Sequence, residues 1–110
     1  MIGPEQARAF WRQYRDVYIT KADIDLLKST EMNSVRVPIH YKFFTKGNDV
    51  GLRLLDRVVS WAKAVGLYVV VDMHMAPGGQ TGTNIDDSYG YPWLYDSPKE
   101  QAHLDRKSVV

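Results

Sequence analysis

Three stretches of the chain carry apolar residues at the spacing of a helix. They run from Pro4 to Tyr18, from Thr20 to about Glu31, and from Val50 to Val65. In each stretch apolar residues return every three or four positions, so they fall on one face of an α-helix. The third stretch is followed by Gly66, a residue that readily takes the left-handed conformation that ends many helices. The pattern therefore predicts three amphipathic helices.

Two short apolar runs have the composition of buried strands. They are Ser34–Ile39, in which Pro38 is expected to end the strand, and Leu67–Met73. Both are rich in β-branched residues and they flank the third predicted helix. A last helix is predicted to begin at Pro98, with Ser97 as its N-cap. Strands that alternate with helices are typical of α/β proteins with a parallel sheet, so we expect this fold class.

Charged and polar side chains interrupt these strands on one face. Side chains alternate along a strand, so Arg36 points away from its apolar neighbours, and Asp72 and His74 share the corresponding face of the second strand. A sheet covered by helices on both faces would bury them, at a cost on the order of several kcal/mol for each unpaired ion. A closed barrel would instead turn them toward its axis and active-site mouth. An ion pair between Arg36 and Asp72 that only joins the strands is an equally good interpretation.

Composition narrows the classes of function. The chain has 110 residues, of which 45% are hydrophobic and 25% charged, which is typical of one globular domain. With a net charge of +1 and scattered basic residues, no nucleic-acid surface is expected. No apolar run approaches the ~20 residues of a membrane span, and the first residues do not resemble a secretory signal. The absence of cysteine excludes disulfides and thiolate chemistry.

Other chemistries are suggested by the segment after the second strand. Asp72 and His74 with Asp86 and Asp87 could supply metal ligands, although no HExxH or EF-hand spacing is present. The glycine-rich segment 77–82 lacks the Lys-Ser/Thr pair of a phosphate-binding loop, so its glycines are ascribed to tight turns. Four aromatic residues follow that could either stack on sugar rings or pack the loop onto the domain: Tyr89, Tyr91, Trp93 and Tyr95.

The two strand segments also resemble a known family. We identify a similarity to glycoside hydrolase family 5, the cellulase family, in Asn33-Ser-Val-Arg-Val-Pro-Ile-His-Tyr41 and in Gly66-Leu-Tyr-Val-Val-Val-Asp-Met-His-Met-Ala-Pro-Gly-Gly-Gln80. The helix between these segments is similar as well. The resemblance implies that residues 1–110 are a fragment of a catalytic (β/α)8 TIM barrel, roughly its strand 2 to strand 3 portion with flanking helices.

The resemblance further implies a retaining glycosidase that cleaves β-linked glucans or related polysaccharides and uses no cofactor. Arg36 would support the catalytic nucleophile, and His74 would donate a hydrogen bond to a sugar hydroxyl in the cleavage subsite. Five more residues at strand ends are expected to line the glycan groove: His40, Tyr41, Gln80, Asn84 and Trp93.

Departures from the family pattern limit this expectation. Retaining hydrolysis uses two carboxyl groups ~5 Å apart, which the family places after its fourth and seventh strands. The glutamates of this chain are Glu5, Glu31 and Glu100, and none matches either position. The family's usual glycine before Asn33 is absent as well, and Glu31 with Met32 stands in its place, which could strain the helix end.

Two alternatives to an active enzyme therefore stay open. The chain could be an inactive fragment or a weak glycan-binding module, or, less favourably, a metal-dependent barrel hydrolase. A partial barrel also leaves two open sheet edges, so self-association through these edges is expected. The expected partner is a β-glucan or related polysaccharide, with neither nucleic acid nor a membrane among the partners.

Overall fold

The chain folds as helices around a two-stranded parallel sheet. The computed structural model describes residues 3–108, with the side chains of residues 3–105. In chain order the elements are α1 (Pro4–Val17), α2 (Lys21–Ser29), β1 (Ser34–His40), η1 (Tyr41–Phe44), α3 (Val50–Ala64), β2 (Tyr68–Met75), η2 (Asn84–Asp86), α4 (Trp93–Asp96) and α5 (Pro98–Ser108). The predicted α/β class is confirmed at this level, because two parallel strands flank a crossover helix.

The sheet keeps its strands in register almost to their ends. Ser34 lies opposite Tyr68 and Pro38 opposite Asp72, and the register shifts only between Ile39 and the next residue. The expectation that Pro38 ends the strand was wrong, since β1 continues through it. Proline is tolerated on an edge strand because its missing N–H removes no ladder hydrogen bond there.

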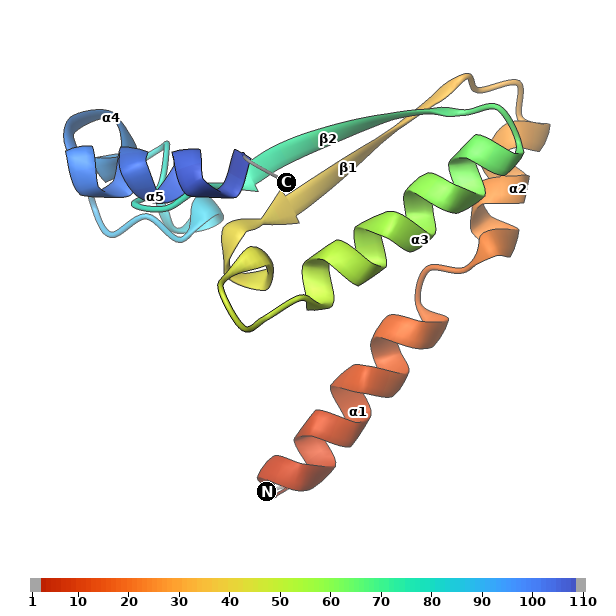
Figure 1. The fold of residues 1–110 in the computed structure, drawn as a ribbon, viewed down its shortest axis with the longest axis horizontal. Helices are drawn as coiled ribbons and strands as arrows, with labels where there is room; N and C mark the ends of the chain where they lie inside the picture. Colours follow the sequence, from red (N-terminus) through yellow and green to blue (C-terminus); the bar gives the residue numbers. More distant parts are fainter. Residues whose placement is uncertain (1–2, 109–110) are drawn as a thin grey trace.

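The core lies where α2 and α3 meet the beginning of the sheet. Ile24, Ala62 and Leu67 are buried together, and partly buried apolar residues pack around them: Leu27, Val58, Trp61, Val65 and Val69. Figure 1 shows α3 running along the sheet, with α2 near the end where the strands begin. The predicted amphipathic faces of α2 and α3 supply this core.

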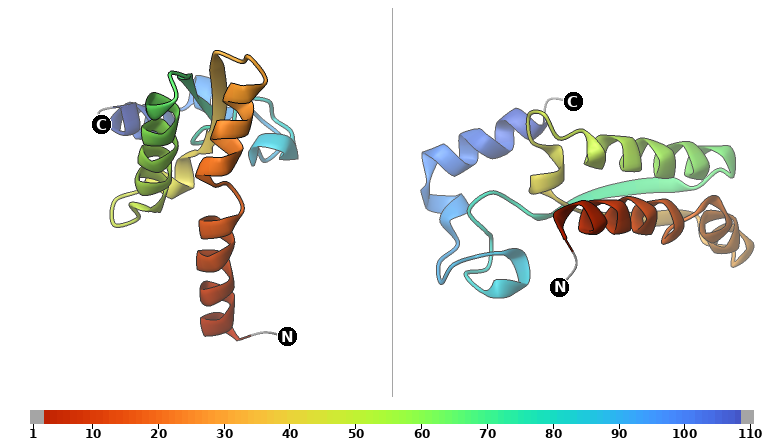
Figure 2. Two further views of the ribbon diagram at one scale, coloured as in Figure 1. Left: turned by 90° about the vertical axis from the view of Figure 1, so that its right-hand side faces the viewer. Right: turned by 90° about the horizontal axis from the view of Figure 1, so that it is seen from below.

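Helix α1 stands apart from the core. Figure 2 shows it extending away from the other elements, and none of its residues is buried. Its apolar side chains pack on one another instead, with ring centroids 4.6 Å apart for Tyr14 and Tyr18 and 5.2 Å apart for Phe10 and Trp11. The helix forms as predicted, but none of its aromatic residues is buried.

The helices that precede the two strands end in the same backbone conformation. Gly66, after α3, has φ 70°, and Glu31, after α2, has φ 64°. The backbone N–H of Gly66 donates to Lys63 O at 3.2 Å and that of Leu67 donates to Ala62 O at 2.9 Å, which is a Schellman closure. The left-handed turn expected at Gly66 is therefore confirmed. At Glu31 the same turn is made by a residue with a side chain.

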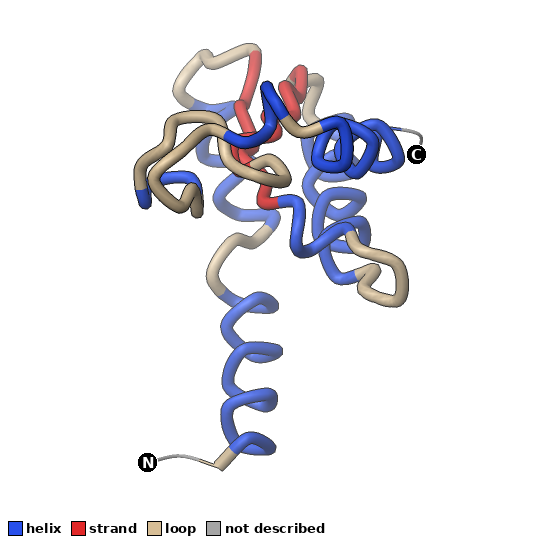
Figure 3. The backbone as a smooth tube through the Cα atoms, turned by 90° about the vertical axis from the view of Figure 1, so that its left-hand side faces the viewer, coloured by secondary structure: helices blue, strands red, loops and turns tan. Residues whose placement is uncertain are grey.

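Short elements gather where the strands end, and the sequence pattern did not reveal them. Figure 3, viewed from this end, shows loops and short helices around the ends of the strands. η1, η2 and α4 have only three or four residues each, which is too few for a periodic pattern. The backbone N–H of Trp93 donates to Gly78 O at 3.1 Å, so α4 is held against the turn that follows β2.

Candidate functional site

Arg36, Asp72 and His74 form one cluster on the exposed face of the sheet. They occupy the alternate positions of β1 and β2 that point away from the core. Arg36 Nη2 donates to Asp72 Oδ2 at 2.5 Å and lies 3.3 Å from His74 Nδ1. His74 Nδ1 is 3.1 Å from the same Asp72 oxygen. The side chains of Arg36 and His74 are 60% and 52% exposed against 28% for Asp72, so the first two are the groups that a ligand can reach.

This cluster restricts the protonation of His74. In a neutral ring Nδ1 cannot both accept a hydrogen bond from Arg36 and donate one to Asp72. The Asp72 oxygen is nearer and carries negative charge, so we assign the proton to Nδ1. Neutral His74 then presents Nε2 as an acceptor. A hydrogen bond donated by Nε2 would require the doubly protonated ring.

His40 and Lys42 are both bound to Asp87 in the loop after β2. Asp87 Oδ2 lies 2.9 Å from His40 Nε2 and accepts from Lys42 Nζ at 2.7 Å. His40 Nδ1 accepts from the backbone N–H of Lys42 at 3.2 Å, so its Nε2 carries the proton and donates to Asp87. The hydrogen bonds from Lys42 and then His40 hold the pKa of Asp87 below its ordinary value, and Asp87 raises the pKa of Lys42. Both ring nitrogens of His40 are thus used to hold η1 to the loop.

Asp86 organises the loop from within. It is buried, and its carboxylate accepts from the backbone N–H of Gln80 at 2.6 Å, that of Thr81 at 2.8 Å and the Ser88 hydroxyl at 2.5 Å. The Ser88 hydroxyl, followed by the N–H groups of Gln80 and Thr81, holds the pKa of Asp86 well below its usual range. A Cβ at Gly79 would lie 1.8 Å from Ser88 Oγ, so the loop requires glycine there.

Gln80 ties this loop to the end of β2. Its side-chain Nε2 donates to Met73 O at 3.1 Å and to His74 O at 3.3 Å. Its backbone N–H is held by Asp86 at the same time. The side-chain amide nitrogen is therefore engaged with the chain itself, at the strand end next to the exposed cluster.

An aromatic pocket opens beside these loops. It has a volume of about 460 Å³ and lies between η1, the end of β2 and the helices α4 and α5. Its lining includes three aromatic residues and two carboxylates: Tyr41, Tyr89, Trp93, Asp87 and Glu100. Aromatic faces pack on the C–H faces of sugars, while carboxylates accept hydrogen bonds from hydroxyl groups. The pocket therefore has the chemistry that a saccharide requires.

The residues predicted to contact glycan are divided among these features. Two lie in the exposed cluster and two in the aromatic pocket: Arg36 and His74, and Tyr41 and Trp93. Two hold the chain together through side-chain hydrogen bonds: His40 and Gln80. Asn84 is exposed at the first residue of η2. Sequence reasoning missed Asp87 and Glu100 as pocket residues, because the loop and helix that carry them are placed by contacts distant in sequence.

The metal alternative finds no assembled ligand set in the described part of the chain. Among residues 3–105, no group of three His, Asp or Glu side chains is placed to hold a metal ion. The carboxylate of Asp86 faces backbone N–H groups, and that of Asp87 faces His40 and Lys42.

No helix in the described range is long and apolar enough to cross a membrane.

Comparison with known proteins identifies the family to which the chain belongs. The family model for cellulase (glycosyl hydrolase family 5) matches residues 3–102. The chain belongs to glycosyl hydrolase family 5. The resemblance predicted from the two strand segments is thus confirmed.

Curated relatives of the chain are fungal glycosidases. It is 37% identical over 86 residues to a probable glucan 1,3-beta-glucosidase A of Aspergillus clavatus, a match that covers 74% of this chain and 21% of the relative. It is 39% identical over 87 residues to a glucan 1,3-beta-glucosidase of Kluyveromyces lactis, covering 74% and 20%. A probable glucan endo-1,6-beta-glucosidase B of Aspergillus flavus is 31% identical over 94 residues, covering 76% and 23%.

The chain thus spans about a fifth of the length of these relatives. No solved structure gives a significant match.

Proposed function

We propose that the chain forms the strand 2 to strand 3 part of the barrel of a retaining β-glucan hydrolase, and that its exposed cluster faces the sugar at the cleavage site. The observation that carries this proposal is the joining of Arg36, Asp72 and His74 through one oxygen on the open face of paired parallel strands. Active sites of (β/α)8 enzymes lie at the C-terminal ends of the strands, and His74 is the second-last residue of β2.

The three side chains have separate roles in this proposal. Arg36 Nη2 contacts Asp72 and His74, while its Nε and Nη1 groups form no hydrogen bond with the described residues. These groups can hold the nucleophilic carboxylate ionised and oriented. Asp72 fixes the position of both neighbours. His74 accepts a hydrogen bond from a sugar hydroxyl at Nε2, in place of the donated hydrogen bond that the family resemblance implied, because its proton is assigned to Nδ1. Neither catalytic carboxyl group is assigned to this chain.

The substrate class in the proposal is a β-linked glucan. The names of the relatives mention β-1,3- and β-1,6-glucans, and 1,3-linked glucan recurs among them. We therefore take β-1,3-glucan as the first substrate to test and β-1,6-glucan as the second.

The proposal is tested by joining residues 1–110 to the remaining barrel of a relative and measuring hydrolysis of β-1,3-glucan. His74→Ala is expected to lower kcat/KM by about tenfold or more, since a hydrogen bond to the reacting sugar is lost. Tyr68→Ala is the matched control, because Tyr68 lies on the same face of β2 six positions earlier, about 20 Å away. Equal rates for the His74→Ala variant and the unmodified hybrid would contradict the assigned role.

A second function, glycan binding without turnover, is favoured by the aromatic pocket. Its rings and carboxylates can bind a sugar without a nucleophile. In this function Trp93→Ala would abolish oligosaccharide binding by the isolated 110-residue chain, whereas His74→Ala would leave that binding unchanged. The two variants thus separate the two functions by NMR titration with a soluble β-1,3-gluco-oligosaccharide.

A further inference from the structure

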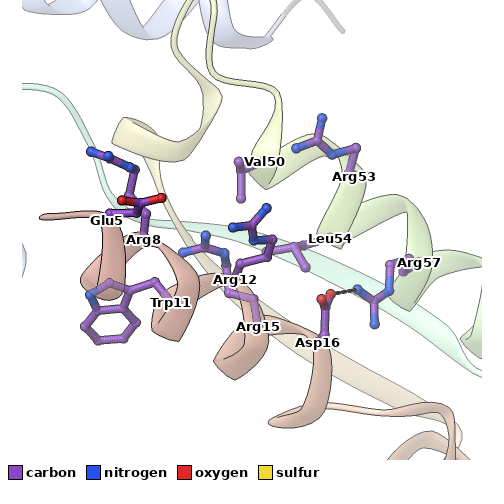
Figure 4. A pocket seen from close by; sticks show the side chains of 10 residues that line it. All are labelled: Glu5, Arg8, Trp11, Arg12, Arg15, Asp16, Val50, Arg53, Leu54 and Arg57. Carbon is purple, nitrogen blue, oxygen red and sulfur yellow. Dashed lines mark hydrogen bonds and ion pairs between the residues drawn. The ribbon is translucent and has the colours of Figure 1, made fainter.

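A cleft lined by arginine lies between α1 and α3, and it shares no residue with the aromatic pocket. Its volume is about 790 Å³. Five arginines line it and no lysine does: Arg8, Arg12 and Arg15 from α1, and Arg53 and Arg57 from α3. Figure 4 shows Arg12 and Arg15 extending from α1 into the space before Val50 and Leu54. Two carboxylates, Glu5 and Asp16, also line the cleft, so positive charge predominates.

The chain's own carboxylates satisfy only part of this charge. Arg57 pairs with Asp16 at 3.1 Å and Arg53 with Asp49 at 2.5 Å. Arg8, Arg12 and Arg15 form no ion pair or side-chain hydrogen bond with any of the residues that the structure describes. Guanidinium groups held near one another on two helices repel unless an anion lies between them. Arginine binds carboxylates through two parallel N–H groups. The cleft therefore favours bound carboxylates over loosely associated anions from the solvent.

The cleft also contains apolar side chains, and its arginines are spaced about one helical turn apart. Val50, Leu54 and Trp11 line it together with the arginines. The arginines of α1 follow one another at steps of four and three residues, and those of α3 at a step of four, which is about 6 Å along a helix axis. A third helix with glutamates three or four residues apart repeats its charges at the same step. Its apolar stripe would lie on Leu54 and Val50.

We propose that this cleft is the docking site for an acidic amphipathic helix of a partner polypeptide. The carboxylates of that helix lie between the two rows of arginines, and its apolar stripe covers the apolar side chains. A polyphosphate or a polyanionic glycan would match the charge but would leave Leu54 and Val50 uncovered. The proposal does not depend on the function proposed for the sheet face, since the two sites share no residue.

The test uses the unmodified 110-residue chain and a labelled, Ala-rich helical peptide of about 18 residues with Glu at every third or fourth position and Leu on one face. Fluorescence anisotropy of the peptide measures binding. We expect saturable binding that weakens as salt rises, because exposed charges are screened. The same peptide with Gln for Glu, and a sequence-shuffled peptide of the same composition, are expected to bind at least about tenfold more weakly.

Protein variants locate the peptide. Arg12→Gln with Arg15→Gln is expected to weaken binding about tenfold, whereas Lys28→Gln with Lys63→Gln, which removes the same charge elsewhere, leaves it within about twofold. The double variant Arg12→Lys with Arg15→Lys keeps the charge but loses the paired N–H groups of arginine, so it should retain only part of the affinity. Unchanged binding by the glutamine double variant, equal loss in the lysine control, or tighter binding of inorganic polyphosphate than of the acidic peptide would each overturn the proposal.

Discussion

Replacing Glu31 by glycine should stabilise the chain. Glu31 follows α2 with φ 64°, in the left-handed region that suits glycine, and its backbone N–H closes the helix by donating to Lys28 O at 3.2 Å. The side chain is exposed and contributes no hydrogen bond within the described residues. The substitution therefore removes the steric cost of the Cβ and leaves the closing hydrogen bond in place.

The magnitude follows from two opposing effects. An L-residue in the left-handed region costs about 1–2 kcal/mol relative to glycine. Glycine gives the unfolded chain more freedom, which takes back about 0.5–1 kcal/mol. With the middle of each range, the net gain in the free energy of unfolding is about 0.5–1 kcal/mol. For a domain of this size that corresponds to a rise in Tm of about 2–8 °C.

Urea unfolding followed by circular dichroism measures this change, and the turn at Gly66 provides the control. Gly66 has φ 70° at the equivalent place after α3, and a Cβ there would meet nothing within 4 Å. Gly66→Ala should therefore destabilise by about 1 kcal/mol through conformation alone. If Gly66→Ala destabilises while Glu31→Gly has no effect or an adverse one, the cost assigned to the left-handed glutamate is incorrect.

Three other outcomes are expected. Asp72→Ala removes the acceptor of the His74 Nδ1 proton and leaves Arg36 as the donor facing Nδ1, so the neutral ring should change to the Nε2–H tautomer, which long-range ¹H–¹⁵N NMR detects; an unaltered Nδ1–H form would contradict the assignment. The folded-state pKa values of Asp86 and Asp87 lie below the ordinary 3.8, so their stabilisation is present above that pH and is lost as pH falls below it; Asp86→Asn should flatten this loss in acid melts. The two-stranded sheet has an unpaired edge on each side among the described residues, so sedimentation should show association that grows with concentration, and a monomer at all concentrations would refute it.

Periodic patterns in the sequence located the long elements because those patterns are local. The stretches that became α1, α2, α3 and the two strands were all identified, and their ends differ from prediction by a few residues. The predicted end of β1 at Pro38 was too early. The sequence does not show that β1 lies at a sheet edge within the described part, where proline is tolerated. The exposure of α1 could not be foreseen either, because periodicity shows that a face is apolar but not what covers it.

The candidate site was predictable where alternation along a strand determines direction. That rule placed Arg36, Asp72 and His74 on one face, and the structure joins them. It gave no guidance for the loop after β2, where hydrogen bonds to a buried carboxylate set the path of the chain. Asp87 reaches His40 across 47 residues of sequence, a contact that no local pattern encodes.

The side-chain amide of Gln80 has a consequence for any ligand that touches both the sheet face and the aromatic pocket. It donates hydrogen bonds to the carbonyl groups of Met73 and His74, while Asp87 in the same loop accepts hydrogen bonds from His40 and Lys42. The loop's conformational entropy is therefore lost when the chain folds and not when a ligand binds. A preorganised surface of this kind binds with a smaller entropic penalty, so removing the Gln80 hydrogen bonds should weaken affinity even for ligands that never contact Gln80.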